Sequence, residues 1–227
     1  MFFEKILNFF DLFHQSRIVN YLEKLEIKYF IDVGAHKGEF LGYLSKLNHK
    51  KIYVFEPQKK IFKILNHNFK ENKKIKFFNI ALGDKNSKKT FYVNKLSLTS
   101  TFSVSKKTLF SKIKNFLLNS KNSYIHKYSI KTTKLDDIML KEKINNLFLK
   151  VDVEGFELNV LKGAKKLISS KVKYILVERQ FFQLYKDYSP DQVELFLKEN
   201  DFKLLKKFTY PLLHFQDNLY IRKKQKY

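Results

Sequence analysis

The residues best suited to chemistry form an acidic cluster. Asp152, Glu154 and Glu157 lie within six residues around the end of the apolar run 147–153, and Glu178 ends the next apolar run along the chain. We expect the run 147–153 to be a strand, whose alternation would place Asp152 and Glu154 on the same side. Carboxylates at the edge of a folded core are costly unless they are paired, hydrated or bound to a ligand. They could act as a general base, accept hydrogen bonds from substrate hydroxyls or contribute to a metal site. The dipole of a helix that begins here would account for Glu157 but not for Asp152.

A second group of residues could bind a nucleoside. The segment Asp32-Val33-Gly34-Ala35-His36-Lys37-Gly38 joins an expected strand to an expected helix, and its glycines let the backbone turn tightly and approach a ligand. Its pattern, D-x-G-x-x-x-G, lacks the middle glycine of the pyrophosphate-binding fingerprint. Glu56 ends the next expected strand, where a carboxylate can accept both hydroxyls of a ribose. Each feature alone is compatible with an ordinary turn or a hydrated strand end, but together they predict a site for a nucleoside without pyrophosphate.

Both groups depend on a fold that brings the ends of strands together. Short apolar runs alternate with helical periodicity, which predicts an α/β fold with a parallel sheet. We expect strands at 29–33, 52–55, 76–80, 147–153 and 174–177, helices at 40–47, 61–69, 135–140, 157–168 and 190–200, and a closing hairpin from 202–208 and 218–221. Because ligands of open α/β sheets bind beyond the carboxyl ends of the strands, both groups should lie at that edge.

The alternation of strands and helices breaks between residues 85 and 134. Here we expect strands at 89–93 and 129–133, with one helix at 109–118 inside a stretch rich in Ser, Thr and Lys. Long insertions in compact α/β domains are usually functional or mobile, so residues 94–127 are expected to form an insertion on the acceptor side of the site. The chain as a whole is expected to divide into an N-terminal amphipathic helical segment, residues 1–27, and a main domain, residues 28–227.

The composition narrows the class of protein. A chain of 227 residues, of which 44% are hydrophobic, can bury a substantial core. Its net charge is +23, from 45 Lys and Arg against 22 Asp and Glu, which suits an anionic partner such as nucleic acid or a membrane surface. Only Arg17, Arg179 and Arg222 are arginine, the residue preferred for bidentate phosphate and base contacts. The charge alone therefore does not decide the function, and nucleic acid is not the favoured partner.

Cysteine and histidine usage excludes several kinds of site. The chain has no cysteine, which rules out disulfides, cysteine-based zinc sites and cysteine nucleophiles, and fits a reducing, cytoplasmic compartment. Its six histidines show no metal-ligand spacing, so we predict no metal.

The first residues predict an amphipathic helix rather than a targeting segment. They do not have the basic start and uninterrupted apolar stretch of a signal peptide, and no apolar run in the sequence approaches the roughly 20 residues needed to cross a bilayer. The apolar residues on one side of this helix are Phe3, Ile6, Leu7, Phe10 and Phe13. We expect the helix to dock on the main domain, and peripheral contact with a membrane is the alternative.

Several segments resemble those of a known family in both content and order. From residue 29 to residue 178 they read FIDVGAHKGEF, VFEPQ, IALGD, SLTSTF, KTTKLDDI, LKVDVEGFELNVLKGA and ILVERQ. They resemble the FkbM family of S-adenosylmethionine-dependent methyltransferases, and residues 149–164 are the most specific match. The resemblance implies the class I methyltransferase, Rossmann-like α/β fold: a seven-stranded, mostly parallel sheet with an antiparallel last strand and helices on both faces. It also implies S-adenosylmethionine as the cofactor and O-methylation of a hydroxyl, often on a sugar or polyketide.

The resemblance also implies roles for individual residues. The cofactor-binding residues would be Asp32, Gly34, Ala35, Gly38, Glu56, Pro57, Ala81, Leu82 and Asp84, although Asp84 could equally be a turn residue. An alcohol is a weak nucleophile, so a base must take its proton as the new bond forms. We expect Asp152 to be that base or to orient the hydroxyl, with Glu178 or His36 assisting. The substrate-side residues would be Glu154, Ser100 and Thr101.

Three other functions remain open at the level of sequence. A nucleic-acid methyltransferase would use the basic charge, but where base-amine methylation typically brings N/D-P-P-Y/F/W this chain has Asp152-Val153-Glu154-Gly155. A non-catalytic basic protein at an anionic surface would not need the glycine turn together with Glu56. An NAD-dependent dehydrogenase is disfavoured by the missing middle glycine. The favoured acceptor is a hydroxyl of a small molecule or glycan, and an anionic acceptor would suit the lysine-rich surface.

Overall fold

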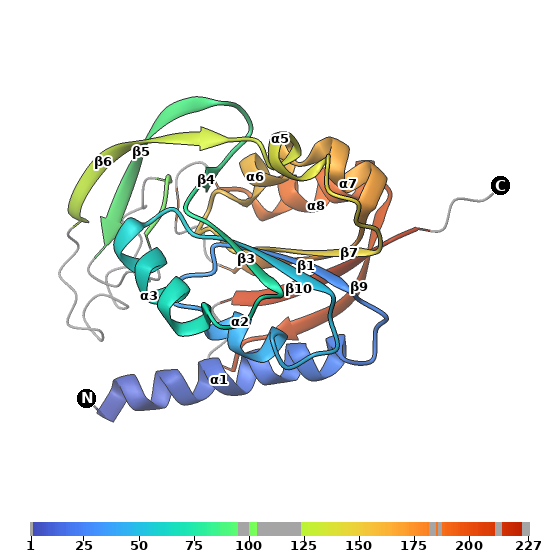
Figure 1. Ribbon diagram of the computed structural model, residues 1–227, viewed down its shortest axis with the longest axis horizontal. Coiled ribbons are helices and arrows are strands. Elements are labelled where there is room, and N and C mark those ends of the chain that lie inside the picture. The colour runs from blue at the N-terminus through green and yellow to red at the C-terminus, as the bar shows by residue number, and fades with distance from the viewer. Residues whose placement is uncertain are drawn as a thin grey trace.

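The computed structural model describes residues 2–94, 100–103, 124–181, 185, 188–211 and 215–223. In this part of the chain a central sheet carries helices on both faces, and a second, smaller sheet lies beside it (Figure 1). The expected α/β class is confirmed.

The central sheet has the strand order β3-β2-β1-β7-β8-β10-β9. Its members are β1 (Tyr29–Val33), β2 (Lys51–Phe55), β3 (Ile75–Phe78), β7 (Leu147–Val151), β8 (Val172–Gln180), β9 (Phe202–Thr209) and β10 (Phe215–Arg222). The five strands from β3 to β8 in this order are parallel, and β10 is antiparallel to both of its neighbours. The expectation of a seven-stranded, mostly parallel sheet with an antiparallel last strand is confirmed.

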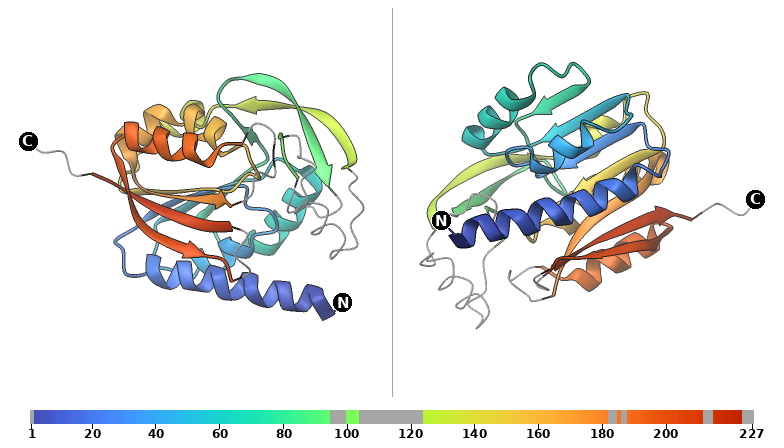
Figure 2. Two further views of the ribbon diagram at one scale, coloured as in Figure 1. Left: turned by 180° about the vertical axis from the view of Figure 1, so that it is seen from behind. Right: turned by 90° about the horizontal axis from the view of Figure 1, so that it is seen from below.

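Helices pack on both faces of this sheet, because the residues of its central strands β1 and β7 are buried on both sides. One face carries α1 (Phe2–Leu22), α2 (Glu39–Leu44) and α3 (Lys59–Phe69), and the other carries α5 (Leu135–Met139), α6 (Glu157–Gly163), α7 (Lys165–Lys171) and α8 (Pro190–Glu199) (Figure 2). Successive strand residues point to opposite faces. Phe30 of β1 therefore joins the core that contains Leu41 of α2, and Ile31 joins the core that contains Leu161 of α6.

The contact between α1 and the sheet is made by the second half of the helix. Ile18 and Leu22 are buried in the same core as the apolar residues of α2. His14, one turn before Ile18, is also buried, and it is hydrogen-bonded to Asp217 of β10. Phe13, which we expected on the apolar side of the helix, is 48% exposed instead. Apolar periodicity could not find the true contact face because that face includes a histidine with a buried partner. The side chains of Phe3, Ile6 and Leu7 lie outside the described residues.

The second sheet has the order β4-β6-β5, with β4 (Ala81–Leu82), β6 (Tyr124–Thr133) and β5 (Ser87–Asn94). The strands expected at 89–93 and 129–133 are therefore present and longer than predicted. Most of the expected insertion at 94–127, including the helix predicted at 109–118, lies outside the described residues. Its segment 100–103 is described, and Thr101 exchanges two backbone hydrogen bonds with Tyr92 of β5, at 2.8 and 3.0 Å.

Several element boundaries differ from the predicted ones; α2 ends at Leu44 rather than at residue 47, and β3 ends at Phe78 rather than at residue 80. β7 ends at Val151 rather than at residue 153, and Glu154 then takes up a left-handed backbone conformation with φ 55°. Asp152 and Glu154 therefore do not follow the strand alternation that we expected for them. The helix predicted at 157–168 is divided into α6 and α7, because Ala164 has φ −110° and ψ 12°, outside helical geometry.

In the part of the chain that the structure describes, no helix is both long enough and apolar enough to cross a membrane.

Candidate active site

A cavity that is open to solvent lies at the carboxyl ends of β1, β2 and β7. Its lining consists of Val33, Gly34, His36, Phe55, Glu56, Pro57, Gln58, Ile80, Leu82, Phe91, Ser100, Phe102, Asp152, Val153, Glu154 and Phe156. One side is apolar and comes largely from the small sheet and the segment 100–103. Three carboxyl groups, those of Glu56, Asp152 and Glu154, also line the cavity. This is the edge of the sheet at which the sequence predicted a ligand.

The floor of the cavity is the turn that follows β1. Gly34 and Ala35 both donate backbone hydrogen bonds to the carbonyl of Phe55 on β2, at 3.0 and 3.2 Å. Gly34 has φ +83°, and a Cβ there would lie 1.8 Å from the backbone oxygen of Asp152. Only glycine fits at this crossing of two strand ends. The next turn residue, His36, also has a left-handed backbone, with φ 50°. Such strain is typical of functional sites.

Glu56 is held at the end of β2 by backbone donors. Its Oε2 accepts from the amide of His36 at 3.1 Å, and its Oε1 accepts from the amide of Gln58 at 2.8 Å. Its side chain is buried, and this burial raises the pKa of Glu56 to about 7 although the two amides favour the charged form. The carboxyl group is therefore fixed in position and titrates close to neutral pH.

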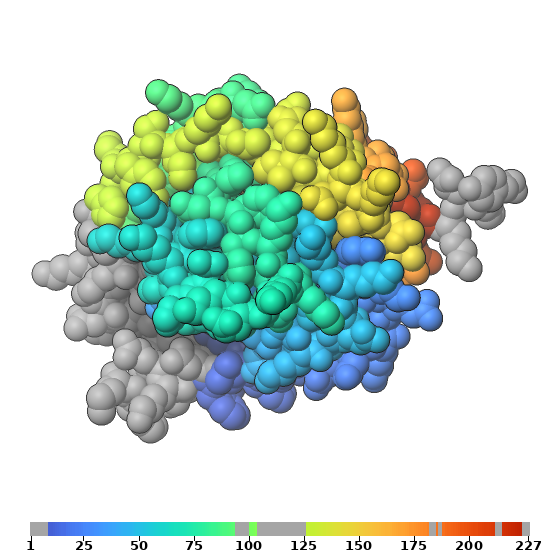
Figure 3. Space-filling model, in the orientation of Figure 1, coloured from blue at the N-terminus to red at the C-terminus, as the bar shows by residue number. Residues whose placement is uncertain are grey.

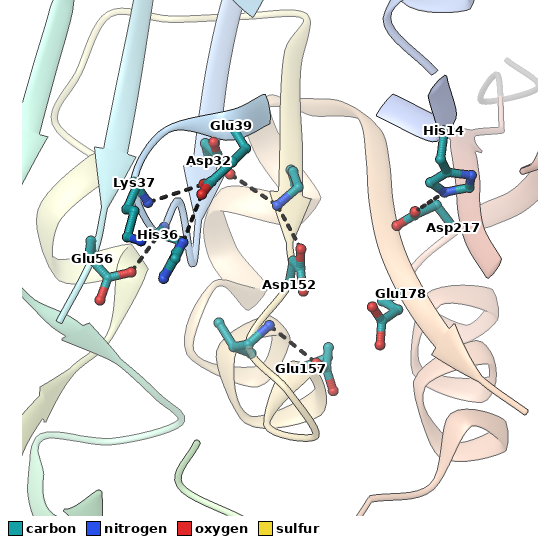
Figure 4. A network of polar contacts seen from close by, with 12 residues as sticks. His14, Asp32, His36, Lys37, Glu39, Glu56, Asp152, Glu157, Glu178 and Asp217 are labelled. Carbon is teal, nitrogen blue, oxygen red and sulfur yellow. Dashed lines mark hydrogen bonds and ion pairs between the residues drawn. The ribbon is translucent and has the colours of Figure 1, made fainter. Parts of the chain in front are cut away.

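A buried lysine forms ion pairs with two carboxylates, one on β1 and one that follows β7. The Nζ of Lys150 on β7 lies 3.3 Å from Oδ1 of Asp32 on β1 and 3.0 Å from Oδ2 of Asp152 (Figure 4). Burial alone would lower the pKa of Lys150, but the two carboxylates raise it above its ordinary value. Burial also raises the pKa of Asp32, which is fully enclosed, against the opposing effect of Lys150. The ion pair fixes the carboxylate of Asp152 at the cavity wall.

The backbone and side chain of Glu154 are held by the surrounding loops. Thr101 donates its hydroxyl to the carbonyl of Glu154 at 2.5 Å, and Tyr185 donates its hydroxyl to Oε2 of Glu154 at 2.5 Å. The amide of Gln180 lies 3.4 Å from the same oxygen. Burial, together with the charge of Glu154, raises the pKa of Tyr185 well above its ordinary value. Gly155 makes room for this arrangement, since a Cβ there would lie 2.5 Å from the ring of Tyr185.

Two further carboxyl groups lie behind the cavity wall. Oε1 of Glu157 accepts from the amides of Val153 and Gly155, at 3.3 and 3.0 Å, and burial raises the pKa of Glu157 to about 8. Glu178 on β8 accepts from the side-chain amide of Gln180 at 3.0 Å. Burial, followed by the charges of Glu154 and Asp152, raises the pKa of Glu178 well above its ordinary value. Glu157 therefore shapes the loop that carries Asp152 and Glu154.

The structure brings together about half of the residues that the sequence singled out. Those that line the cavity are Gly34, His36, Glu56, Pro57, Leu82, Ser100, Asp152 and Glu154. Within the described residues, the others contribute no surface to it: Asp32, Ala35, Gly38, Ala81, Asp84, Thr101 and Glu178. Asp84 forms an ion pair with Lys89 of β5 at 3.6 Å. Asp32 and Thr101 instead support Asp152 and Glu154 from behind.

Sequence reasoning missed three residues that hold the acidic side of the site. Lys150 had a signal: it is a charged residue inside an apolar strand, two positions before Asp152, and a lysine there needs a buried partner. Tyr185 and Gln180 lie in or next to a loop, and no periodicity or motif in the sequence connects them to Glu154. In the described part of the chain, no group of three or more His, Asp or Glu residues is arranged to hold a metal ion.

The strand order and the position of this cavity define the class I methyltransferase fold. Residues 32–204 match the family described as the methyltransferase FkbM domain. This match covers more than half of the chain, which therefore belongs to the FkbM methyltransferase family. No curated protein matches the chain by sequence.

Solved structures with a similar fold include an FkbM methyltransferase from Methylobacillus flagellatus, at a TM-score of 0.55 and 17% identity. The match covers 86% of this chain and 43% of that one, so this chain spans less than half the length of the Methylobacillus protein. Magnesium protoporphyrin IX methyltransferase from Synechocystis, solved with bound S-adenosylmethionine, matches at a TM-score of 0.55 and 10% identity, over 96% and 83% of the two chains. A putative RNA methyltransferase from Pyrococcus horikoshii matches at a TM-score of 0.50 and 11% identity, over 92% of this chain and 83% of that one.

These identities are low, and the likenesses concern the fold. Together with the family match, they support the enzyme class that the sequence motifs implied. The chain is an S-adenosylmethionine-dependent methyltransferase, with S-adenosylmethionine as its cofactor.

Proposed function

We propose that this enzyme methylates a hydroxyl group on a small molecule or glycan, at the acidic side of the cavity. The observation that carries the proposal is that Asp152 and Glu154 line the same cavity as Gly34 and Glu56. A carboxylate accepts a hydrogen bond from a hydroxyl and can take its proton as the oxygen is alkylated. The protein carries a net charge of +23, yet the charged groups that line this cavity are acidic. This contrast points to a chemical role for these carboxyl groups.

The residues on the other side of the cavity fit the cofactor. The absence of a side chain at Gly34 lets the turn after β1 pass against the backbone of Asp152, where a Cβ would collide. Glu56 presents a fixed carboxyl group suited to two ribose hydroxyls, and Ile80, Leu82 and Phe156 offer an apolar wall suited to an adenine ring. When bound here, S-adenosylmethionine supplies a methyl group on a positively charged sulfur, which is the electrophile.

Asp152 is the residue that we assign to the acceptor hydroxyl. Lys150 holds its carboxylate at 3.0 Å, so the group that receives the hydroxyl hydrogen bond is positioned before the acceptor arrives. His36 also lines the cavity, with its Nδ1 3.0 Å from Oε1 of Glu39, and remains the second candidate for this role. Glu178 accepts a hydrogen bond from the side-chain amide of Gln180, which also contacts Glu154. Glu178 therefore helps to position Glu154 and does not contact the acceptor itself.

The acceptor class is tested by methyl transfer from labelled S-adenosylmethionine to a panel of nucleotide sugars, polyols, glycolipids and RNA. The proposal predicts label in one of the hydroxyl acceptors without RNA. Label only in RNA, with binding that falls steeply as salt is raised, would instead assign the basic surface to a nucleic-acid acceptor.

Cofactor affinity is expected to depend on pH through Glu56. The ionised carboxyl accepts two ribose hydroxyls, whereas the protonated form accepts fewer. Because the pKa of Glu56 is raised to about 7 by burial, affinity for S-adenosylmethionine should rise with pH through neutrality and weaken below it. The Glu56→Gln variant should bind about tenfold to a hundredfold more weakly, the loss expected for a hydrogen bond to a charged group. Calorimetric titration at pH 6, 7 and 8 measures both effects.

The control for this prediction is Glu199→Gln, which makes the same change at the end of α8, outside the cavity lining. It should leave the affinity and its pH profile unchanged. If Glu56→Gln retains the wild-type affinity and the wild-type pH profile, Glu56 does not hold the ribose.

A further inference from the structure

Among the described side chains, part of the outer face of α1 is apolar and exposed. In the described residues, seven large hydrophobic side chains are exposed, and three of them are Phe9, Leu12 and Phe13 at 64%, 51% and 48%. Their spacing of three and four residues places them on one face of the helix. That face is opposite to the one that buries Ile18 and Leu22 in the sheet. We call Phe9, Leu12 and Phe13 the outer patch.

The outer patch lies at the same edge of the molecule as the cavity. Tyr210, which follows the carboxyl end of β9, donates to the side chain of Asp11 at 2.6 Å, and Arg17 donates to the carbonyl of Thr209 at 3.2 Å. β9 is parallel to β8, so Thr209 and Tyr210 stand at the carboxyl edge of the sheet. Figures 1 and 2 show the N-terminal end of α1 on the side where β5 and β6 lie. In Figure 3 atoms of the described part of α1 lie at part of the lower margin of the molecule.

Positive charges flank the outer patch on both sides. The guanidinium of Arg17 lies 5.7 Å from the ring centre of Phe13. On the α2 side, the Nζ of Lys46 lies 5.7 Å from the ring centre of Tyr43, whose hydroxyl donates to the carbonyl of Leu12. Aromatic and aliphatic side chains bordered by cations are the composition of helices that lie in the interface of an anionic bilayer.

A nucleic acid or a second copy of this chain would use only one of the two properties of this surface, its positive charges or its apolar side chains. A nucleic acid would use the cations but gains little from exposed leucine and phenylalanine. A second copy of this chain would cover the apolar side chains but would bring two molecules of net charge +23 together. An anionic lipid surface uses both properties at once.

We propose that α1 binds an anionic lipid bilayer through Phe9, Leu12 and Phe13, and so holds the mouth of the cavity at the membrane surface. If the proposed O-methylation is correct, on which this part rests, the acceptor hydroxyl belongs to a molecule anchored in that bilayer, such as a glycolipid. The membrane binding itself does not depend on the reaction.

The binding is tested with the whole chain and vesicles of phosphatidylcholine, with or without phosphatidylglycerol, in a flotation assay. The wild type should float with the anionic vesicles only, and less as salt is raised. The Leu12→Ser and Phe13→Ser variants should each lower the partition coefficient by about tenfold or more, because each loses a buried apolar side chain. Leu195→Ser is the matched control, since Leu195 of α8 is 54% exposed on the opposite face of the sheet and should change nothing.

A second measurement reports on position directly. The chain has no tryptophan, so Phe13→Trp introduces a single reporter. Its emission should shift to shorter wavelength on addition of anionic vesicles, whereas that of Leu195→Trp should not. The proposal is overturned if the wild type does not float, if Leu195→Ser loses as much binding as Leu12→Ser, or if the outer-patch variants abolish self-association instead.

The proposed function is tested separately by titration of S-adenosylmethionine without lipid. Vesicle binding by a protein that binds no cofactor would overturn the proposed function and leave the membrane proposal standing. Cofactor binding without vesicle binding would overturn the membrane proposal and leave the proposed function standing.

Discussion

The Asp152→Asn variant is expected to lose about 10²- to 10⁴-fold in turnover, the usual contribution of a general base, while its affinity for S-adenosylmethionine is retained. The amide keeps the size of the side chain but can no longer take a proton from the acceptor hydroxyl. Because Asp152 lines the cavity while Gly34 and Glu56 are unchanged, the loss should fall on kcat rather than on cofactor binding. Single-turnover methyl transfer and calorimetric titration separate the two.

The matched control is Asp191→Asn. Asp191 is exposed in the first turn of α8 and pairs with Arg179 at 3.2 Å, away from the cavity lining. This variant should turn over at the wild-type rate. Full activity of Asp152→Asn with the natural acceptor would remove Asp152 from the reaction and leave His36, the second candidate at the cavity wall.

The Lys150→Met variant is expected to lose about 3–5 kcal/mol of unfolding free energy, the cost of leaving a buried charge without its partner. Asp32 is fully enclosed, and Lys150, 3.3 Å away, is its ion-pair partner. The loss should shrink as pH falls, because burial already raises the pKa of Asp32 and the neutral acid needs no cation. Urea unfolding at several pH values measures the loss of unfolding free energy and shows whether it shrinks as pH falls.

A double variant tells this electrostatic effect from a simple loss of packing. Lys150→Met combined with Asp32→Asn removes both charges and should recover much of the stability lost in the single variant. The same double variant should turn over slowly, since Asp152 no longer has the cation that positions it. Equal stability of the wild type and Lys150→Met, or no recovery in the double variant, would contradict the role assigned to the ion pair.

The parts of the structure that sequence reasoning predicted are those encoded locally. The apolar runs fixed the strands, and the turn at Gly34 and the carboxylate at Glu56 were found because each directly follows a strand. Parallel strands then place these residues at one edge without further information. Asp152 lies at the cavity, as expected for a residue at the end of this strand, but β7 ends before it, so strand alternation does not set the direction of its side chain.

The parts that sequence reasoning missed depend on partners that are distant along the chain. Tyr185 contacts Glu154 from a loop, and its position follows from tertiary packing against Gly155. Similarly, α1 docks through a face that includes His14, whose burial is possible only because Asp217 of β10 bonds to it at 2.8 Å. No pattern in either segment alone contains that information. The exposed position of Phe13 follows from the same contact.

The central claim is that this cavity transfers a methyl group to oxygen. The most direct test uses S-adenosylmethionine labelled with carbon-13 at the methyl group, the 227-residue chain and the acceptor found in the panel, with the product read by carbon-13 NMR. The account predicts a methyl signal bonded to oxygen, formed by the wild type and lost in Asp152→Asn. A methyl signal bonded to nitrogen, or an oxygen-bonded signal formed equally well by Asp152→Asn, would contradict it.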